Sequence, residues 1–174
     1  MKTALVFAGQ GAHRKGMCMD LVTSGGKSPA WRAWTTAQQS LAAKHNFDVT
    51  TAIRDDPDRL DVDGVALKHP QGVLRHTQLT QAAMLTVQTA LHAEMVDSLA
   101  QMDDGVHCVA GHSLGEFSAL TAAGVFPVER SVGLVYQRGR IMNRCLRDAD
   151  ARRLDYVLFA VNPKRAELDG EQVH

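Results

Sequence analysis

The pentapeptide GHSLG at residues 111–115 constrains the fold of this chain more than any other feature. Before it, Val106–Ala110 is short and apolar, which predicts a buried strand. After it, the small and apolar residues of Leu114–Ala123 predict a helix. Glycines two residues on either side of Ser113 permit a strained strand-to-helix turn, from which the serine side chain projects. The element therefore predicts an α/β fold with an exposed serine at the end of a strand.

The chemistry of this turn favours a nucleophilic serine. A helix N-terminus presents amide N–H groups that have no helical partner, and such groups stabilise a developing oxyanion. The N–H of Leu114, directly after Ser113, is the natural first donor. His112 adjoins the serine, but on so sharp a turn it points away from it. We therefore expect His112 to line the pocket or to hydrogen-bond locally, and not to act as the general base.

Segments typical of strands and of helices alternate along the rest of the chain. Ala4–Ala8 predicts a buried strand that ends in a tight Gly-Gln-Gly turn. Asp, Pro and Gly are frequent in Asp48–Gly72, which predicts short helices and loops. This alternation predicts a mostly parallel sheet. The further expected elements are a helix at Pro29–Lys44 capped by Ser28, a helix at Leu79–Leu99, a helix from Pro127 with Val132, Leu134, Val135 and Met142 on its buried side, a charged surface connector at Leu146–Leu154 and a third strand at Tyr156–Val161.

Charge and composition disfavour several classes of function. Lysine plus arginine and aspartate plus glutamate each number 19, so the formal net charge is zero, which argues against a nucleic-acid partner. No apolar run approaches the ~20 residues that span a bilayer, and the N-terminus has no secretory signal, so we expect no membrane association. The three cysteines are unclustered, which predicts no metal site and a reducing, cytoplasmic location.

Four short motifs occur in a characteristic order: FAGQG at 7–11, TQAA at 80–83, GHSLGE at 111–116 and QRG at 137–139. In this order they resemble the malonyl-CoA:acyl-carrier-protein acyltransferases, a family that includes the acyltransferase domains of fatty acid and polyketide synthases. Longer phrases are similar to the malonyl/palmitoyl transferase domain of the fungal-type fatty acid synthase β subunit. These phrases are HTQLTQ at 76–81, YQRGRIM at 136–142 and DYVLFAVNP at 155–163.

The resemblance implies a fold and a set of site residues. It implies an α/β-hydrolase-like acyltransferase core, of which residues 1–154 are the N-terminal part, and an incomplete ferredoxin-like subdomain at residues 155–174. It implies Ser113 as the nucleophile that carries the acyl ester, and the backbone N–H groups of Gln10 and Leu114 as the oxyanion hole. Arg138 would bind the free carboxylate of malonyl, because a guanidinium fork matches a carboxylate. Gln81 would line the pocket near that carboxylate, and His112 would also contact substrate.

The resemblance also implies substrates and partners. Malonyl, and also long-chain acyl groups, would move between coenzyme A and the phosphopantetheine of an acyl carrier protein. Both would be substrates, and no bound cofactor is expected. The carrier protein and other domains or subunits of a fatty acid or polyketide synthase are the expected partners. A local basic rim such as Arg138 and Arg140 suffices to bind a carrier protein despite the zero net charge.

One part of the family pattern is absent from the sequence. In the family, the general base is a histidine about a hundred residues after the nucleophile. Here 61 residues follow Ser113, and the only histidine among them is His174. We therefore expect a C-terminally truncated domain with weak or no turnover. Two alternatives stay open: a serine esterase or thioesterase-type hydrolase, which shares GxSxG, and a catalytically incomplete remnant of a fatty acid synthase.

Overall fold

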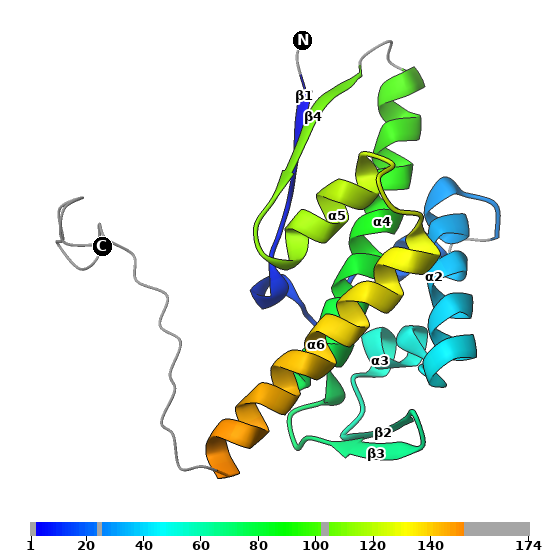
Figure 1. Cartoon of the computed structure of the whole chain (residues 1–174). Coiled ribbons are helices and arrows are strands. Elements are labelled where there is room, and N and C mark those ends of the chain that lie inside the picture. Colours follow the sequence, from blue (N-terminus) through cyan, green and yellow to red (C-terminus); the bar gives the residue numbers. More distant parts are fainter. Residues whose placement is uncertain (1–2, 24–25, 102–104, 152–174) are drawn as a thin grey trace, which may run out of the picture. The chain divides into compact units, whose positions relative to one another are not determined.

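The computed structural model describes residues 3–23, 26–101 and 105–151 (Figure 1). It divides into two compact units, residues 1–143 and residues 144–174. In the second unit the described residues, 144–151, are the end of the last helix, α6 (Val128–Ala151). The strand expected at 156–161, the ferredoxin-like subdomain expected at 155–174 and its boundary lie outside the described residues. The first unit contains every other element.

Two parallel strands, β1 (Thr3–Phe7) and β4 (Val106–Gly111), lie side by side. Their register pairs Phe7 with Gly111, so the carboxyl ends of the two strands meet. Both strands were predicted, with ends that differ by one residue, and their parallel pairing confirms the expected α/β class. Leu5 and Phe7 are buried on one face of the pair, whereas Val6 is 78% exposed on the other. Side chains alternate between the faces of a strand, so these two strands are covered on one side.

The helix α4 (Thr77–Gln101) forms the centre of the first unit. Every residue from 79 to 90 is buried, polar ones included. The predicted helix at Leu79–Leu99 is thus confirmed, but its first half has no solvent-facing side, which is typical of a helix enclosed on all sides. The shorter helix α5 (Leu114–Ala122) packs on the strands, where Ala119 contacts Leu5 and Phe7.

A long helix, α2 (Pro29–His45), packs against α4 and confirms the predicted start signal. Ser28 precedes the helix, and its Oγ accepts a hydrogen bond of 3.0 Å from the Trp31 N–H. Pro29 occupies the first helical position, where its missing N–H costs nothing. Trp34 and Leu41 are buried where α2 faces the core. A short helix, α1 (Met19–Thr23), precedes α2.

The segment Asp48–Gly72 was only partly predicted. It contains the short helix α3 (Val49–Asp55), as expected, but also a β-hairpin formed by β2 (Arg59–Val62) and β3 (Val65–Lys68). The hairpin turn is Asp63-Gly64, and both residues have positive φ. Asp-Gly between alternating residues is the sequence signal of a two-residue hairpin turn. The many Asp, Pro and Gly residues concealed this signal in the sequence.

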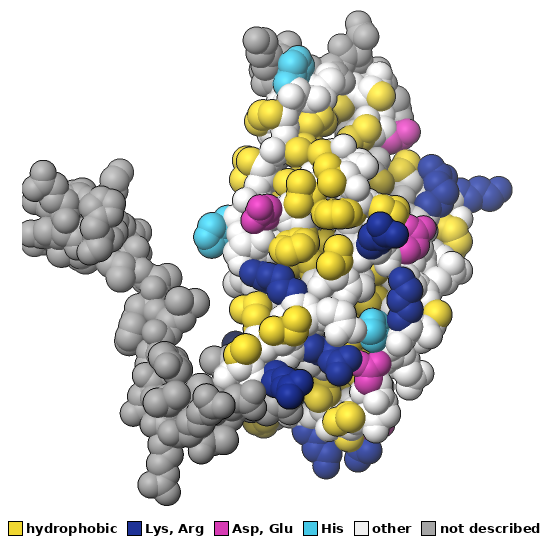
Figure 2. Space-filling model, viewed as in Figure 1, with side chains coloured by type: hydrophobic (Ala, Val, Ile, Leu, Met, Phe, Trp, Pro, Cys, Tyr) yellow, Lys and Arg dark blue, Asp and Glu magenta, His cyan; other side chains and the backbone are white. Residues whose placement is uncertain are grey.

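Two expectations for α6 were wrong. Val132 and Val135 are buried as predicted, but Leu134 and Met142 are each 40% exposed. The buried stripe follows 132, 135, 136 and 139; position 134 faces away from it, whereas 142 is in line with 135 but lies beyond the last buried position. Hydrophobic side chains are visible over α5 and α6 in Figure 2. The charged segment expected as a connector from Leu146 is helical up to Ala151, because its Arg, Asp and Ala residues are all compatible with a helix.

Candidate active site

Ser113 lies in the turn between β4 and α5 with φ 54° and ψ −107°, a conformation that side-chain-bearing residues rarely adopt. The two flanking glycines make this turn possible. A Cβ on Gly111 would overlap the backbone of Gly115, and a Cβ on Gly115 would overlap the carbonyl of Phe7. The GxSxG spacing therefore corresponds to a close approach of helix to strand, as predicted, and it leaves the Ser113 side chain exposed.

The two amides expected as oxyanion donors lie at the carboxyl ends of adjacent strands. Leu114 is the first residue of α5, and Gln10 is the first residue of a 3₁₀ turn, η1 (Gln10–Ala12), which follows β1. The N–H of a first helical residue has no partner within its helix. Pairing of Phe7 with Gly111 and a 3.4 Å hydrogen bond from the His112 N–H to the Phe7 carbonyl bring the two turns together.

Gln88, on α4, holds the start of the Gln10 turn in place. Its Nε2 donates to the Ala8 carbonyl over 2.8 Å, and its Oε1 accepts a 2.5 Å hydrogen bond from Ser118 on α5. The side chains of Gln88 and Ser118 are buried, so these bonds are shielded from water. Sequence reasoning missed both residues, because a polar residue on a helix is ordinarily read as solvent-facing.

A chain of hydrogen bonds joins the side chains of all four motifs. Arg138, on α6, donates from Nη2 to Ser113 Oγ over 3.2 Å and from Nη1 to Gln81 Oε1 over 2.8 Å. Gln81, on α4, donates from Nε2 to Gln10 Oε1 over 3.3 Å. The guanidinium of Arg138 also lies over the ring of Phe117, 5.6 Å from its centroid. Residues 10, 81, 113 and 138 therefore converge, although they are far apart in the sequence.

Gln81 is completely buried, which gives its amide one defined orientation. Arg138 can only donate hydrogen bonds, so the carbonyl oxygen of Gln81 must face it. The Nε2 of Gln81 then points to Gln10 and to the Met142 sulfur, which lies 3.2 Å away. The amide thus holds the guanidinium beside Ser113 before any substrate binds.

Comparison with known proteins shows which family has this sequence pattern. The profile of the "Acyl transferase domain" matches residues 4–169, nearly the whole chain. The chain belongs to this family. A fatty acid synthase subunit beta from Gibberella zeae is 30% identical over 209 residues, covering 96% of this chain and 10% of that protein. A malonyl CoA-acyl carrier protein transacylase from Staphylococcus aureus is 33% identical over 141 residues, covering 81% of this chain and 38% of that enzyme.

Solved structures agree with the sequence comparison. One similar solved chain comes from the complex of a type II polyketide synthase acyl-carrier protein with its malonyl-transacylase. It matches this chain with a TM-score of 0.62 and 27% sequence identity. That match covers 83% of this chain and 40% of the solved one. The fold of this acyl transferase domain is therefore the α/β acyltransferase fold that the motifs predicted. The chain spans between a tenth and two fifths of the length of these relatives.

The histidines of this acyl transferase domain do not pair with Ser113 in the described part of the chain. His112 is exposed, and its ring lies beside Gly9. His13 makes a 2.8 Å hydrogen bond through Nδ1 to the Gln10 carbonyl oxygen. Among the described residues, no histidine is hydrogen-bonded to Ser113 Oγ, and His174 lies outside them.

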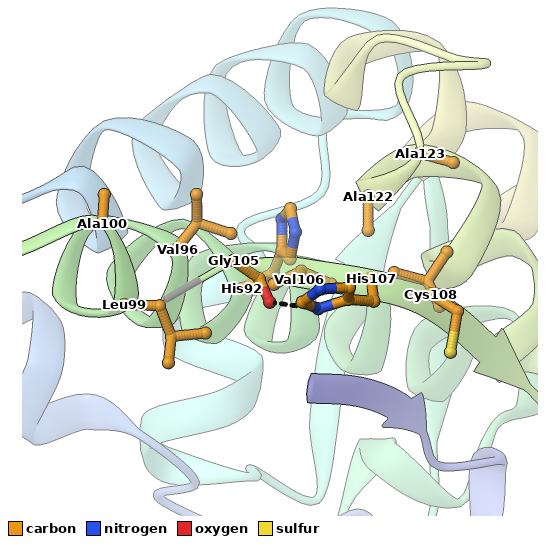
Figure 3. A pocket seen from close by; sticks show the side chains of 11 residues that line it. His92, Val96, Leu99, Ala100, Gly105, Val106, His107, Cys108, Ala122 and Ala123 are labelled. Atoms are coloured by element: carbon orange, nitrogen blue, oxygen red, sulfur yellow. Dashed lines mark hydrogen bonds between the residues drawn. The ribbon is translucent and has the colours of Figure 1, made fainter. Parts of the chain in front are cut away.

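A hollow of 470 Å³ lies at the amino end of β4, at the opposite end of the strand from Ser113 (Figure 3). His92, His107 and Cys108 line it together with apolar residues of α4 and α5. Burial of the half-exposed His92 ring lowers its pKa. The His107 Nδ1 is 2.8 Å from the Gly105 carbonyl oxygen, so this ring bonds to its own strand. No group of three or more metal-ligating side chains occurs in the described residues, here or elsewhere.

The described helices lie within residues 3–23, 26–101 and 105–151. None of the helices there combines enough length with enough apolar character to cross a bilayer.

Proposed function

We propose that this acyl transferase domain moves malonyl between coenzyme A and the phosphopantetheine of an acyl carrier protein, through an ester on Ser113. One observation carries the proposal: Arg138 contacts Ser113 Oγ at 3.2 Å while the buried Gln81 fixes its other nitrogen. A malonyl ester on Ser113 extends one methylene beyond its carbonyl to a carboxylate, within the span of the same guanidinium. A plain esterase has no carboxylate to bind.

In the first proposed step, Ser113 Oγ attacks the thioester carbonyl carbon, and its proton passes to solvent water, which returns a proton to the leaving sulfur. The negative charge on the carbonyl oxygen is stabilised by the backbone N–H groups of Gln10 and Leu114. The bond from carbon to sulfur then breaks, and coenzyme A leaves as the thiol. In the second step, the thiol of the carrier protein attacks the ester and regenerates Ser113. No metal and no bound cofactor takes part in this scheme.

Arg138 gives the proposed preference for malonyl. A planar guanidinium binds a carboxylate through two parallel hydrogen bonds. Gln81 and the Phe117 ring hold Arg138 before substrate arrives, so little side-chain entropy remains to be lost on binding. When malonyl binds, its carboxylate replaces Ser113 Oγ as the partner of Nη2.

A second candidate substrate is a long-chain acyl group. An apolar hollow of 290 Å³ lies beside Arg138, between α5 and α6. It is lined by Phe117, Leu134, Gln137, Arg138, Ile141 and Met142. We propose that the methylene chain of a longer acyl ester follows this hollow, because apolar lining favours burial of such a chain by about 0.8 kcal/mol per methylene.

The proposed partners are those of a fatty acid or polyketide synthase. The similarity to a synthase β subunit and to a transacylase solved with its carrier protein supports this assignment. We also propose a cytoplasmic location, which the three free cysteines, Cys18, Cys108 and Cys145, support.

Intact-mass spectrometry of the chain incubated with malonyl-CoA tests the proposal. We expect a malonyl adduct on Ser113 that forms over hours, because no histidine among the described residues is hydrogen-bonded to the serine, and that is absent in Ser113→Ala. Added carrier protein should then remove the adduct and become malonylated. Release of malonate with no loading of the carrier would identify a hydrolase. No adduct on the wild-type chain would favour the catalytically incomplete remnant and end the proposal.

A further inference from the structure

A second cluster of polar side chains lies at the tip of the β2–β3 hairpin, where it contacts α6. The carboxylate of Asp63 accepts a 2.9 Å hydrogen bond from Tyr136 Oη and a 3.2 Å bond from Arg140 Nη1, both on its Oδ2. Its Oδ1 lies 3.2 Å from Nδ1 of His45, the last residue of α2. One carboxylate thus joins the hairpin, the end of α2 and the middle of α6.

The cluster is well anchored. The Asp63 N–H donates to the His45 carbonyl over 2.8 Å, which satisfies one of the carbonyls left free at a helix end. Tyr136 is completely buried, and its ring stacks on His45 with centroids 4.0 Å apart. Burial and the hydrogen bond to Asp63 raise the pKa of Tyr136, so it stays a neutral donor. Asp63 is partly shielded, with 28% of its side chain exposed.

Tyr136 and Arg140 lie one helical turn apart on α6, and Arg138 lies between them. Residues four apart share a helix face, so Tyr136 and Arg140 both reach Asp63. Arg138 is two residues from each, and it reaches in another direction, to Gln81 and Ser113. The rotation of α6 about its own axis therefore sets both contacts at once.

Further contacts of α6 include the buried Val132 and Val135 and a hydrogen bond between Ser131 and Thr121 in its first half. Nearer to Arg138, the contact at Gly139 restrains the distance of α6 from α4 more than its rotation. A Cβ on Gly139 would overlap the backbone of Gln78, so the two helices touch at a position without a side chain. A rotation of α6 by about 20° would move a side-chain tip ~5–6 Å from the axis by about 2 Å. Such a shift removes a hydrogen bond of 3.2 Å.

We propose that Asp63 is a positioning residue: through Tyr136 and Arg140 it fixes the rotation of α6 at which Arg138 reaches Ser113, and so sets the preference for a carboxylated acyl group. This inference rests on the proposed function for its consequence in substrate choice. The claim that Asp63 determines the position of the Arg138 guanidinium does not depend on the substrate.

The informative variant is Asp63→Asn. Asparagine tolerates the positive φ of this turn and keeps an acceptor oxygen, so the hairpin is retained while the charge that holds Arg140 is lost. Asp61→Asn is the matched control, because Asp61 lies in the same hairpin and, within the described part of the chain, its carboxylate forms an ion pair only with the exposed Arg59, over 3.4 Å. Arg140→Gln removes the same ion pair from the α6 side and leaves the turn unaltered, in case Asp63→Asn fails to fold.

Two measurements test the proposal on the full chain. Calorimetry gives the ratio of the Kd for acetyl-CoA to that for malonyl-CoA. We expect this ratio to fall about tenfold in Asp63→Asn and Arg140→Gln, because the Kd for malonyl-CoA rises while the Kd for acetyl-CoA stays the same. In Asp61→Asn the ratio should stay unchanged. The second measurement is the rate at which the guanidinium protons of Arg138 exchange with water, followed by NMR. Their signal is assigned by its loss in Arg138→Lys. We expect slow exchange in the wild type and fast exchange in Asp63→Asn.

The outcomes separate the two proposals. Equal weakening of both thioesters with a lower melting temperature would mean a purely structural role and overturn the inference. Unchanged Arg138 exchange in Asp63→Asn would overturn it as well. If the wild-type chain shows no preference for malonyl-CoA, the proposed function fails. In that case, the Arg138 signal still decides whether Asp63 positions the guanidinium.

Discussion

The two ends of β4 differ in how their polar side chains are used. At the carboxyl end, Ser113 is hydrogen-bonded to Arg138, and this contact continues to Gln81 and Gln10. At the amino end, the 470 Å³ hollow contains two histidines and a cysteine, all groups capable of chemistry. There, however, His107 contacts the backbone of its own strand and of Thr3.

The difference favours the carboxyl end as the proposed site, although the larger hollow and several reactive residue types lie at the amino end. The carboxyl end has a smaller apolar hollow nearby, of 290 Å³, but its polar groups come from four separate segments and form one chain of hydrogen bonds that ends at Ser113 Oγ. Convergence of this kind requires that segments far apart in the sequence pack against one another. It is the property that a reaction with a defined geometry requires.

The largest expected effect separates Ser113 from the thiol at the hollow of the amino end, Cys108. Ser113→Ala should abolish the malonyl adduct, because removal of the nucleophile typically costs ~10⁴–10⁶ in rate. Cys108→Ala, at the amino end, should leave the adduct unchanged. Intact-mass spectrometry of both variants after incubation with malonyl-CoA measures this. An adduct that survives in Ser113→Ala and disappears in Cys108→Ala would reverse the comparison.

A second contrast concerns the glycines at the two ends. Gly115→Ala forces a Cβ into the carbonyl of Phe7 and should lower the free energy of unfolding by about 3 kcal/mol. Gly105→Ala, before the amino end, meets no atom within 4 Å and should change it by less than about 0.5 kcal/mol. Urea denaturation measures both values. Equal losses of unfolding free energy in the two variants would mean that the turn between β4 and α5 is not closely packed against β1.

A third contrast concerns the carboxylate of the substrate. Arg138→Ala should weaken malonyl-CoA binding about tenfold to a hundredfold more than acetyl-CoA or palmitoyl-CoA binding, because a charged hydrogen-bonded pair is lost. His107→Ala should change none of the three. Calorimetric titration with each thioester gives the ratios. Equal losses for all three acyl groups would remove Arg138 from carboxylate recognition.

The smallest effect belongs to His92 at the amino end. Burial lowers its pKa in the folded state, so the unfolded chain binds the proton more readily below the ordinary histidine pKa of ~6.5. Its contribution to stability is therefore lost as the pH falls through that value towards the lower folded pKa. Urea midpoints at pH 7.5 and 5.5 should differ less in His92→Gln than in the wild type. An identical pH dependence would show that His92 is not desolvated.

The sequence predicted the parts of the site that rest on local rules. GxSxG predicted the turn between β4 and α5, because a side chain at either glycine of this one turn would overlap backbone atoms. The family motifs predicted that Arg138, Gln81 and Gln10 belong to one site. Their roles in the reaction stay predictions. Asp63 and Gln88 were missed, because their importance arises from contacts with segments dozens of residues away. The exposed Leu134 was misplaced for a related reason: a spacing shows which residues share a face, but not which face the rest of the protein covers.

The burial of the first half of α4 on all sides has a consequence for synthesis of the chain. Residues 77–101 leave the ribosome before α5 and α6, which later enclose them, while α2 is already available to cover one side. Until residues 114–143 follow, the remaining apolar surface faces water, and such surface makes a nascent chain prone to aggregate. We therefore expect this protein to depend on chaperones during translation more than its zero net charge and ordinary composition suggest.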